Sequence, residues 1–163
     1  MKFKKNKGFT LLELIVVIAV ISILAVILLP RFVRITKPAN DARRLADIRT
    51  IQGYLELYYQ QNRSYPVKTA NGAGAFGSGN NCGTGTVCYD LILAGVATSI
   101  PADPVELGNY YYRYESTGAG QSYVIGAQLE APNPSALKDD VDGTQGSIDC
   151  DGGSPETVYC VQF

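Results

Sequence analysis

The sequence predicts an α+β protein, in which one long N-terminal helix packs against a small antiparallel β-sheet head. The first observation behind this is an apolar run over residues 9–29 that continues into an amphipathic pattern ending near residue 60. The second is a C-terminal half with short β-rich runs separated by turns that contain glycine. The chain has 163 residues, which is enough for an anchor and one modest domain.

A short basic segment, residues 1–8, comes before the apolar run and ends in Gly8. Four of the 14 basic residues lie in it: Lys2, Lys4, Lys5 and Lys7. Positive charge beside a membrane-spanning helix is retained in the cytoplasm. We therefore expect residues 1–8 to be a leader peptide that remains on the cytoplasmic side.

Residues 9–29 have the length and composition of a single membrane-spanning helix. Only Thr10, Glu13 and Ser22 are polar. At ~1.5 Å per residue the run spans the roughly 30 Å hydrocarbon core of a bilayer. We expect these residues to be the transmembrane half of the helix, in the inner membrane, with the N-terminus in the cytoplasm.

Glu13 is the unusual residue of this run, because a carboxylate in a spanning helix costs on the order of 2.5–3.5 kcal/mol. Its position near the end of the run allows it to reach the membrane surface. Alternatively, it has a charged partner. A cut between Gly8 and Phe9 would create an α-amino group close to Glu13, on the same chain or on a neighbouring copy, and that group could pair with it.

The amphipathic half of the helix is expected over residues 30–60. Pro30 should kink or locally melt the helix without ending it, because the periodic pattern resumes beyond it. The predicted buried face recurs at steps of three and four. It consists of Leu45, Ile48, Ile51, Gln52, Leu55, Tyr58 and Tyr59.

The head is expected over residues 61–163. Its predicted elements, in order, are a Gly- and Asn-rich loop (68–90), a short helix (89–96), a hairpin of two strands (109–116 and 121–130), a polar acidic loop (132–153) and a final strand (157–163). The four cysteines form two close pairs, Cys82 with Cys88 and Cys150 with Cys160. Of the three possible connectivities, the two local bridges are favoured because each closes a short loop. Zinc is a weaker alternative, since the chain has neither histidine nor a Cys-x-x-Cys motif.

The acidic loop contains five aspartates in thirteen residues: Asp139, Asp140, Asp142, Asp149 and Asp151. Such a cluster is either a solvated loop or a site for a hard cation such as Ca²⁺. From residue 60 onward there are four basic and eleven acidic residues, a net charge of −7, so we expect no binding to nucleic acid. The chain has no histidine base and no recognisable catalytic motif, so we do not expect an enzyme.

The segment "KGFTLLELIVVIAVISILAVILLP", residues 7–30, closely resembles the N-terminal signature of type IV pilins and pseudopilins. The resemblance implies a pilin-like fold. It also implies that a prepilin peptidase cuts after Gly8 and methylates Phe9, and that Glu13 takes part in subunit assembly. Pro30 corresponds to the proline that marks the helix region that unwinds in assembled filaments.

Two further segments, "ADIRTIQGYLELYYQQNRSYP" and "IPADPVELGNYYYRYE", resemble the major pseudopilins of type II secretion systems. This implies a pseudopilus subunit that supports protein secretion, and a structural Ca²⁺ in the aspartate loop. The implied partners are other copies, other pilins or pseudopilins, the prepilin peptidase and an inner-membrane assembly platform. The assembled filament would be periplasmic or at the cell surface.

Two alternatives stay open. The four cysteines and the Gly/Asn-rich loop also suit a major or minor type IV pilin that serves adhesion, motility or DNA uptake. A membrane-anchored enzyme or binding module that uses the leader only for export is the less favoured alternative.

Overall fold

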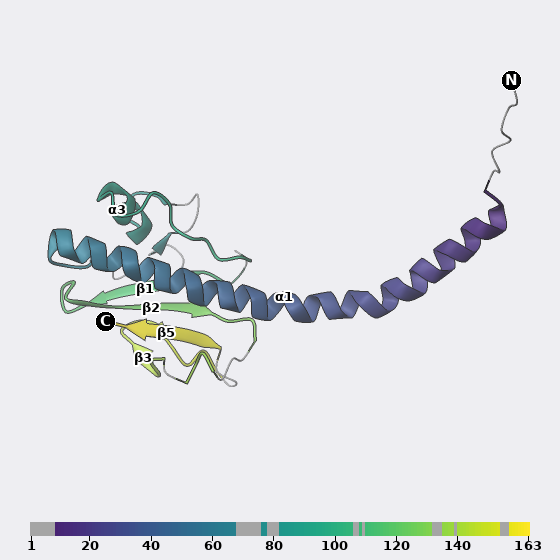
Figure 1. Ribbon diagram of the computed structural model, residues 1–163. Helices are drawn as coiled ribbons and strands as arrows, with labels where there is room; N and C mark the ends of the chain where they lie inside the picture. The colour runs from purple at the N-terminus through teal and green to yellow at the C-terminus, as the bar shows by residue number, and fades with distance from the viewer. Residues whose placement is uncertain are drawn as a thin grey trace, which may run out of the picture. The chain divides into compact units, whose positions relative to one another are not determined.

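The computed structural model describes residues 9–67, 76–77, 82–105, 108, 110–131, 135–138, 140–153 and 157–163, with the backbone alone for residues 27–35. The chain divides into two compact units, Met1–Lys37 and Pro38–Phe163. Helix α1, Leu11–Asn62, begins in the first unit and ends in the second. The helical backbone runs through both Pro30 and Pro38, so the long helix expected from the sequence forms without ending at either proline (Figure 1).

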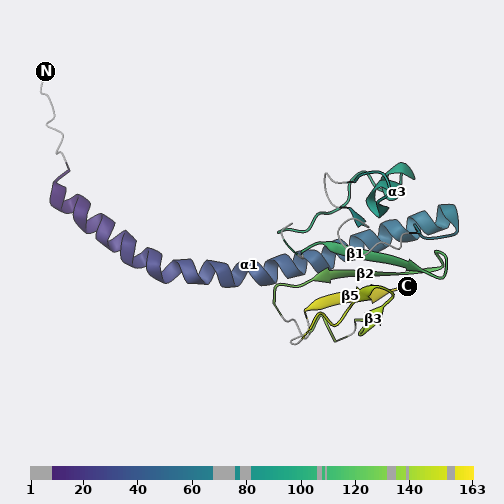
Figure 2. The same ribbon diagram turned by 180° about the vertical axis from the view of Figure 1, so that it is seen from behind.

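The second unit contains a three-stranded antiparallel sheet in the order β1-β2-β5. Its strands are β1 (Tyr112–Thr117), β2 (Ser122–Gln128) and β5 (Val158–Gln162). Strands β1 and β2 form the predicted hairpin, with Thr117 paired with Ser122 beside the turn. The C-terminal part of α1 lies along one face of this sheet, with the short helix α3, Val87–Leu93, beside its end (Figures 1 and 2).

The main core fills the space between the sheet and the two helices. Ile48, Ile51 and Leu55 of α1 are fully buried in it, as the periodic pattern predicts. The remaining four residues of the predicted face are only partly buried. The sheet contributes every second residue of its strands to this core, because successive side chains of a strand point to opposite faces. The buried sheet residues of this core are Tyr112, Tyr114, Tyr123, Ile125 and Ala127.

A second, smaller core covers the other face of the sheet. There, Val124, Val158 and Cys160 pack against Ile148 and Cys150 of the acidic loop. This loop contains a two-stranded sheet of β3 (Thr144–Gln145) and β4 (Ile148–Asp149), which the sequence did not predict. Strand β2 is therefore buried on both faces, which explains its almost continuous apolar composition.

Helix α3 begins two residues before the predicted start. The hydroxyl of Thr86 accepts a hydrogen bond from the backbone N–H of Tyr89, and this N-cap sets the first turn at Val87. Gly95, with φ of +71°, ends the helical segment as expected. Much of the predicted Gly- and Asn-rich loop, including residues 68–75 and 78–81, lies outside the described part of the chain.

Candidate functional site

The N-terminal junction begins at Phe9, whose side chain is 82% exposed, while Gly8 lies outside the described residues. Thr10 and Glu13 form a reciprocal pair at the start of α1. The Glu13 carboxylate accepts hydrogen bonds from the backbone N–H and the hydroxyl of Thr10, at 2.9 and 2.8 Å, and the Thr10 hydroxyl accepts one from the N–H of Glu13 at 3.2 Å. This is a capping box, which satisfies N–H groups that have no partner within the helix.

The capping box gives one oxygen of Glu13 a neutral partner, Thr10, within the first turn of the helix. The charged partner that a cut after Gly8 would create stays a prediction. The sequence carried the signal, since Thr10-Leu11-Leu12-Glu13 before an apolar run matches the capping-box pattern. Glu13 would have to leave Thr10, or share its second oxygen, to pair with another group.

The first half of α1 presents apolar side chains all round. Thirteen large apolar residues between Phe9 and Val26 are exposed in the single chain, from Val17 at 46% to Phe9 at 82%: Phe9, Leu11, Leu12, Leu14, Ile15, Val16, Val17, Ile18, Val20, Ile21, Ile23, Leu24 and Val26. Fully burying each side chain of this kind stabilises by roughly 1.5–3 kcal/mol. A surface of this kind marks a site for another protein or a lipid.

Within the part of the chain that the structure describes, no helix has both the length and the apolar character of a membrane span. Membrane insertion of residues 9–29 therefore stays a prediction.

The second half of α1 is attached to the head by a buried arginine. The side chain of Arg44 is fully buried, and its Nε and Nη2 donate to the two oxygens of Asp103 at 2.7 and 2.9 Å. Its Nη1 donates to Asp41 at 2.7 Å and to Glu130 at 3.1 Å. The guanidinium carbon lies 4.7 Å from the centre of the Tyr110 ring. One side chain thus connects α1 to the segment before β1 and to the residues after β2.

The electrostatics of this cluster favour a permanent charge on Arg44. Burial lowers its pKa, but hydrogen bonds to Asp103, Asp41 and Glu130 outweigh that effect and raise the pKa above its ordinary value. Asp41 is held in turn by the backbone N–H groups of Glu130 and Ala131, at 2.9 and 3.1 Å. Each buried charge therefore has hydrogen-bonded partners, as a stable buried ion pair requires.

Both local disulfides predicted from the sequence are present. Cys82 is bonded to Cys88 at the start of α3, and Cys150 is bonded to Cys160, which joins the acidic loop to the edge strand β5. The loop is also held from β1, because the Glu115 carboxylate accepts hydrogen bonds from the backbone N–H and the hydroxyl of Ser147. The aspartate loop is therefore anchored to the sheet at two points.

Of the predicted aspartate cluster, Asp139 lies outside the described residues. Asp142, Asp149 and Asp151 are exposed. One oxygen of Asp151 accepts the N–H of Gly143 at 2.6 Å. Among the residues that the structure describes, no three acidic, cysteine or histidine side chains come close enough together to hold a metal ion.

Asp140 differs from its neighbours. Its Oδ2 accepts the N–H of Cys160 at 3.2 Å, while its Oδ1 is buried and has no hydrogen-bond partner among the described residues. Burial raises the pKa of this carboxyl, and the negative charges of Asp142 and Asp151 raise it further.

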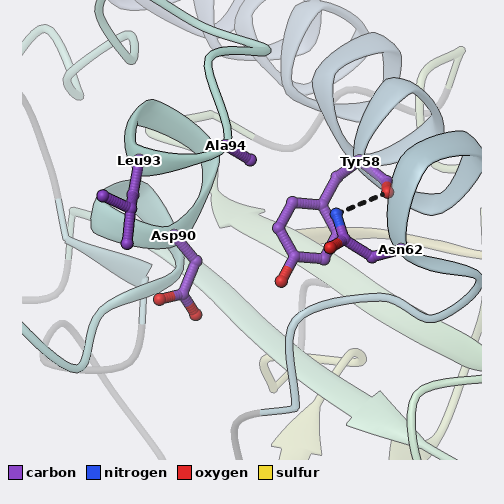
Figure 3. Close-up of a pocket in the computed structure, with 5 residues that line it drawn as sticks. All are labelled: Tyr58, Asn62, Asp90, Leu93 and Ala94. Atoms are coloured by element: carbon purple, nitrogen blue, oxygen red, sulfur yellow. Dashed lines mark hydrogen bonds between the residues drawn. The ribbon is translucent and has the colours of Figure 1, made fainter.

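A pocket of about 230 Å³ lies where the end of α1 meets α3 (Figure 3). It is lined by Tyr58, Asn62, Asp90, Leu93 and Ala94. Sequence reasoning missed this pocket and the Arg44 cluster, because both join residues far apart in the chain. The only local signal for the cluster is a pair of charged residues, Asp41 and Arg44, on the buried side of the helix.

Comparison with known proteins gives one matching family model and several relatives. The family described as "Prokaryotic N-terminal methylation motif" matches residues 3–29. The type IV wide pilus major component PilA4 of Thermus thermophilus is 36% identical over 91 residues, which are 56% of this chain and 67% of that protein.

The type II secretion system core protein G is also similar. The protein from Dickeya chrysanthemi is 33% identical over 72 residues, or 44% of this chain and 46% of that protein. The protein from Escherichia coli is 36% identical over 63 residues, or 39% and 43%. The chain thus matches less than half the length of these two secretion proteins, and no solved structure is significantly similar to it. The signature segment, the long helix on a small sheet and these relatives together show that the chain belongs to the family of type IV pilins and type II secretion pseudopilins.

Proposed function

We propose that this protein is a structural subunit of a helical filament, anchored in the inner membrane until it is assembled, and not an enzyme. The observation that carries the proposal is the first half of α1, where every large apolar side chain from Phe9 to Val26 is exposed in the single chain. Lipid would cover this surface before assembly, and the same segment of neighbouring subunits would cover it afterwards. The pocket lining contains no pair of a nucleophile and a base that would favour catalysis.

Processing would take place at the leader. A prepilin peptidase would cut between Gly8 and Phe9 and methylate Phe9, and an inner-membrane assembly platform would then add the subunit to the filament. Intact-mass measurement of the protein purified from its native host should show the loss of residues 1–8 and the gain of one methyl group. A mature chain that still begins at Met1 would rule this step out.

The role of Glu13 in assembly can be tested with a matched pair of variants. Glu13→Leu removes the carboxylate and the capping box, and it should insert into the membrane yet enter filaments poorly. Ser22→Ala is the control, because the Ser22 hydroxyl donates only to the Ile18 carbonyl of its own helix at 2.7 Å. Equal filament yields from the two variants would contradict a charge-dependent role for Glu13.

The more specific proposal is a pseudopilus of a type II secretion system. The similarity to the type II secretion system core protein G of Dickeya chrysanthemi and of Escherichia coli supports it. The second candidate is a type IV pilin, supported by the more extensive match to PilA4. Deletion of the gene in the host separates the two: loss of secreted proteins favours the pseudopilus, whereas loss of surface filaments with normal secretion favours the pilus.

We also propose that the aspartate loop binds Ca²⁺. The support is the buried Oδ1 of Asp140, which has no partner among the described residues, and the carboxylate of Asp142 close by in sequence. Carboxylate oxygens are the ligands that Ca²⁺ prefers, and bound calcium would offset the negative charge of a loop that has five aspartates and a single lysine.

Thermal unfolding of the full chain in detergent, with calcium or magnesium, tests the calcium site. At a hundred times the dissociation constant, calcium should stabilise the fold by about 2.7 kcal/mol, and Asp140→Asn should abolish the shift. If millimolar calcium leaves the unfolding temperature unchanged, the loop is a solvated acidic loop that β5 and Glu115 hold in place.

A further inference from the structure

Helix α1 starts just after the bond that the proposed processing step would cut. Phe9 and Thr10 are not helical, and α1 begins at Leu11. A hydrogen bond of helical spacing runs from the backbone N–H of Leu14 to the carbonyl oxygen of Thr10, at 3.3 Å. Thr10 therefore has the position of an N-cap, whose carbonyl accepts a helical bond while its own backbone stays outside the helix.

The capping box holds the helix start at this position. The hydroxyl of Thr10 accepts the backbone N–H of Glu13 at 3.2 Å, and the Glu13 carboxylate accepts the N–H and the hydroxyl of Thr10 at 2.9 and 2.8 Å. These bonds require Thr10 to keep a non-helical backbone. They would be lost if the helix grew toward the leader, so they oppose that growth.

The position of the helix start matters for cleavage between Gly8 and Phe9. In that hydrolysis the hydroxyl of a water molecule adds to the carbonyl carbon of Gly8, and its proton goes to the nitrogen of Phe9 as the C–N bond breaks. If α1 were one turn longer, the carbonyl of Gly8 would accept the N–H of Leu12, four residues later, and the helix would shield the bond. Peptidases act on exposed, irregular segments or on segments that open locally.

The sequence around the junction favours the same boundary. Leu11 and Leu12 are good helix formers, so the helix is favoured from its first residue onward. Glycine is a poor helix former because it loses the most backbone entropy, so Gly8 opposes growth of the helix in the other direction. Phe9, between Gly8 and the N-cap, is outside the helix and its side chain is 82% exposed.

We propose that Thr10 is a positioning residue for leader cleavage. As the N-cap of α1 it keeps the bond between Gly8 and Phe9 outside the helix, where the prepilin peptidase can reach it. The inference rests on the processing step proposed above and adds the residue that presents the bond. Thr10 does not touch the reacting atoms, and it acts through the backbone conformation of the residues before Leu11.

Pulse-chase labelling of the full chain in its native host measures the rate at which residues 1–8 are lost from the chain in the membrane fraction. Thr10→Ala removes the cap and should slow this loss about fivefold or more. Thr10→Ser and Thr10→Asn keep a capping side chain and should be cut at close to the wild-type rate. Ser22→Ala is the matched control, because it removes a hydroxyl of the same helix that donates to the Ile18 carbonyl, away from the junction.

A second change separates the cap from direct recognition of the Thr10 side chain by the peptidase. Proline at the first position of a helix fixes the helix start and disfavours helical backbone at the residue before it. Adding Leu11→Pro to Thr10→Ala should therefore restore cleavage to close to the wild-type rate. A peptidase that reads the Thr10 side chain itself would cut the double variant as slowly as Thr10→Ala.

Hydrogen exchange of the uncut chain, purified in detergent from a host that lacks the peptidase, reports the helix start directly. In Thr10→Ala the amide of Leu12 should exchange several times more slowly than in the wild type, because it gains the Gly8 carbonyl as a partner. Adding Leu11→Pro should return its exchange to the wild-type rate.

The outcomes separate this inference from the proposed processing. If the wild type keeps residues 1–8, the processing step fails. If the wild type is cut and Thr10→Ala is cut at the same rate, the role of Thr10 is wrong while the processing stands. Failure of Leu11→Pro to restore cleavage, or unchanged exchange of the Leu12 amide in Thr10→Ala, would also overturn the role of the cap.

Discussion

Replacing Arg44 with alanine should destabilise the head by about 3–5 kcal/mol, the range measured when one partner of a buried ion pair is removed. The side chain is fully buried and makes four hydrogen bonds to three carboxylates, two of them to Asp103 in a bidentate pair. The side chains of Asp41 and Asp103 are 2% and 1% exposed, so the replacement removes the counter-charge of two carboxylates that bulk water reaches poorly. Most of the loss comes from these stranded charges.

Urea unfolding of the full chain in detergent, followed by tyrosine fluorescence, measures this loss. Arg43→Ala is the matched control, because Arg43 is the adjacent residue on the same helix, with a 60% exposed side chain, and should change the free energy of unfolding by less than about 1 kcal/mol. Arg44→Met separates charge from packing. It fills the volume but takes the guanidinium away from the three carboxylates, so it should lose nearly as much as Arg44→Ala. A loss below 1 kcal/mol for Arg44→Ala, or near-complete recovery by Arg44→Met, would refute the account of stranded charges.

Three further predictions concern the head. Replacing both Cys150 and Cys160 with alanine should lower the free energy of unfolding by about 3 kcal/mol, because the bridge closes a short loop. Reduction of the wild type with dithiothreitol, which also opens the Cys82–Cys88 bridge, should cause at least this loss. Gly120→Ala should destabilise the head by roughly 1–3 kcal/mol, because φ is +85° and the new Cβ would lie 2.8 Å from the carbonyl oxygen of Tyr65. The control is Gly53→Ala in the interior of α1, where the new Cβ would have nothing within 4 Å, and it should stabilise the protein by about 0.5–1 kcal/mol. Stability should also fall in alkali, because burial and the hydrogen bond to Glu56 raise the pKa of Tyr65 to about 12. The contribution of Tyr65 to the free energy of unfolding is therefore complete below the unfolded pKa of about 10 and is lost as the pH rises through 12. Titration of tyrosinate absorbance alongside circular dichroism would detect this loss. A free energy of unfolding that stays constant between pH 10 and pH 12 would contradict the last prediction.

The elements that the sequence predicted well are those whose cause is local. Apolar residues at steps of three and four predict the buried helical face of Ile48, Ile51 and Leu55. That pattern holds whichever surface the face packs against. The β1–β2 hairpin follows from alternating strands around a Gly-rich turn. Both disulfides join near neighbours, with separations of 6 and 10 residues, so loop closure already favoured them.

The elements that were missed have causes that are distant in the chain or easily overlooked. The β3–β4 hairpin has two residues in each strand and no alternating pattern, and it is held by Glu115 of β1, which lies 32 residues before Ser147 in the chain. The capping-box pattern that begins at Thr10 is visible in the sequence, but hydropathy marks Glu13 only as a charge within an apolar run. As the third residue of α1, Glu13 accepts a hydrogen bond from the backbone N–H of Thr10, and a hydropathy pattern contains no information about such bonds.

By itself, the sequence determined the family of the protein, the long helix and the surface by which that helix would meet lipid or its neighbours, because a leader, an apolar run and a periodic pattern each act within a few turns of the chain. Only the tertiary structure decided how the head is attached and where it has a pocket. The contact of Arg44 with Asp103 spans 59 residues, and Tyr58 meets Asp90 only after α3 folds against α1. A buried charge is stable only where its partners have already been brought together, and no local pattern of residues records that condition.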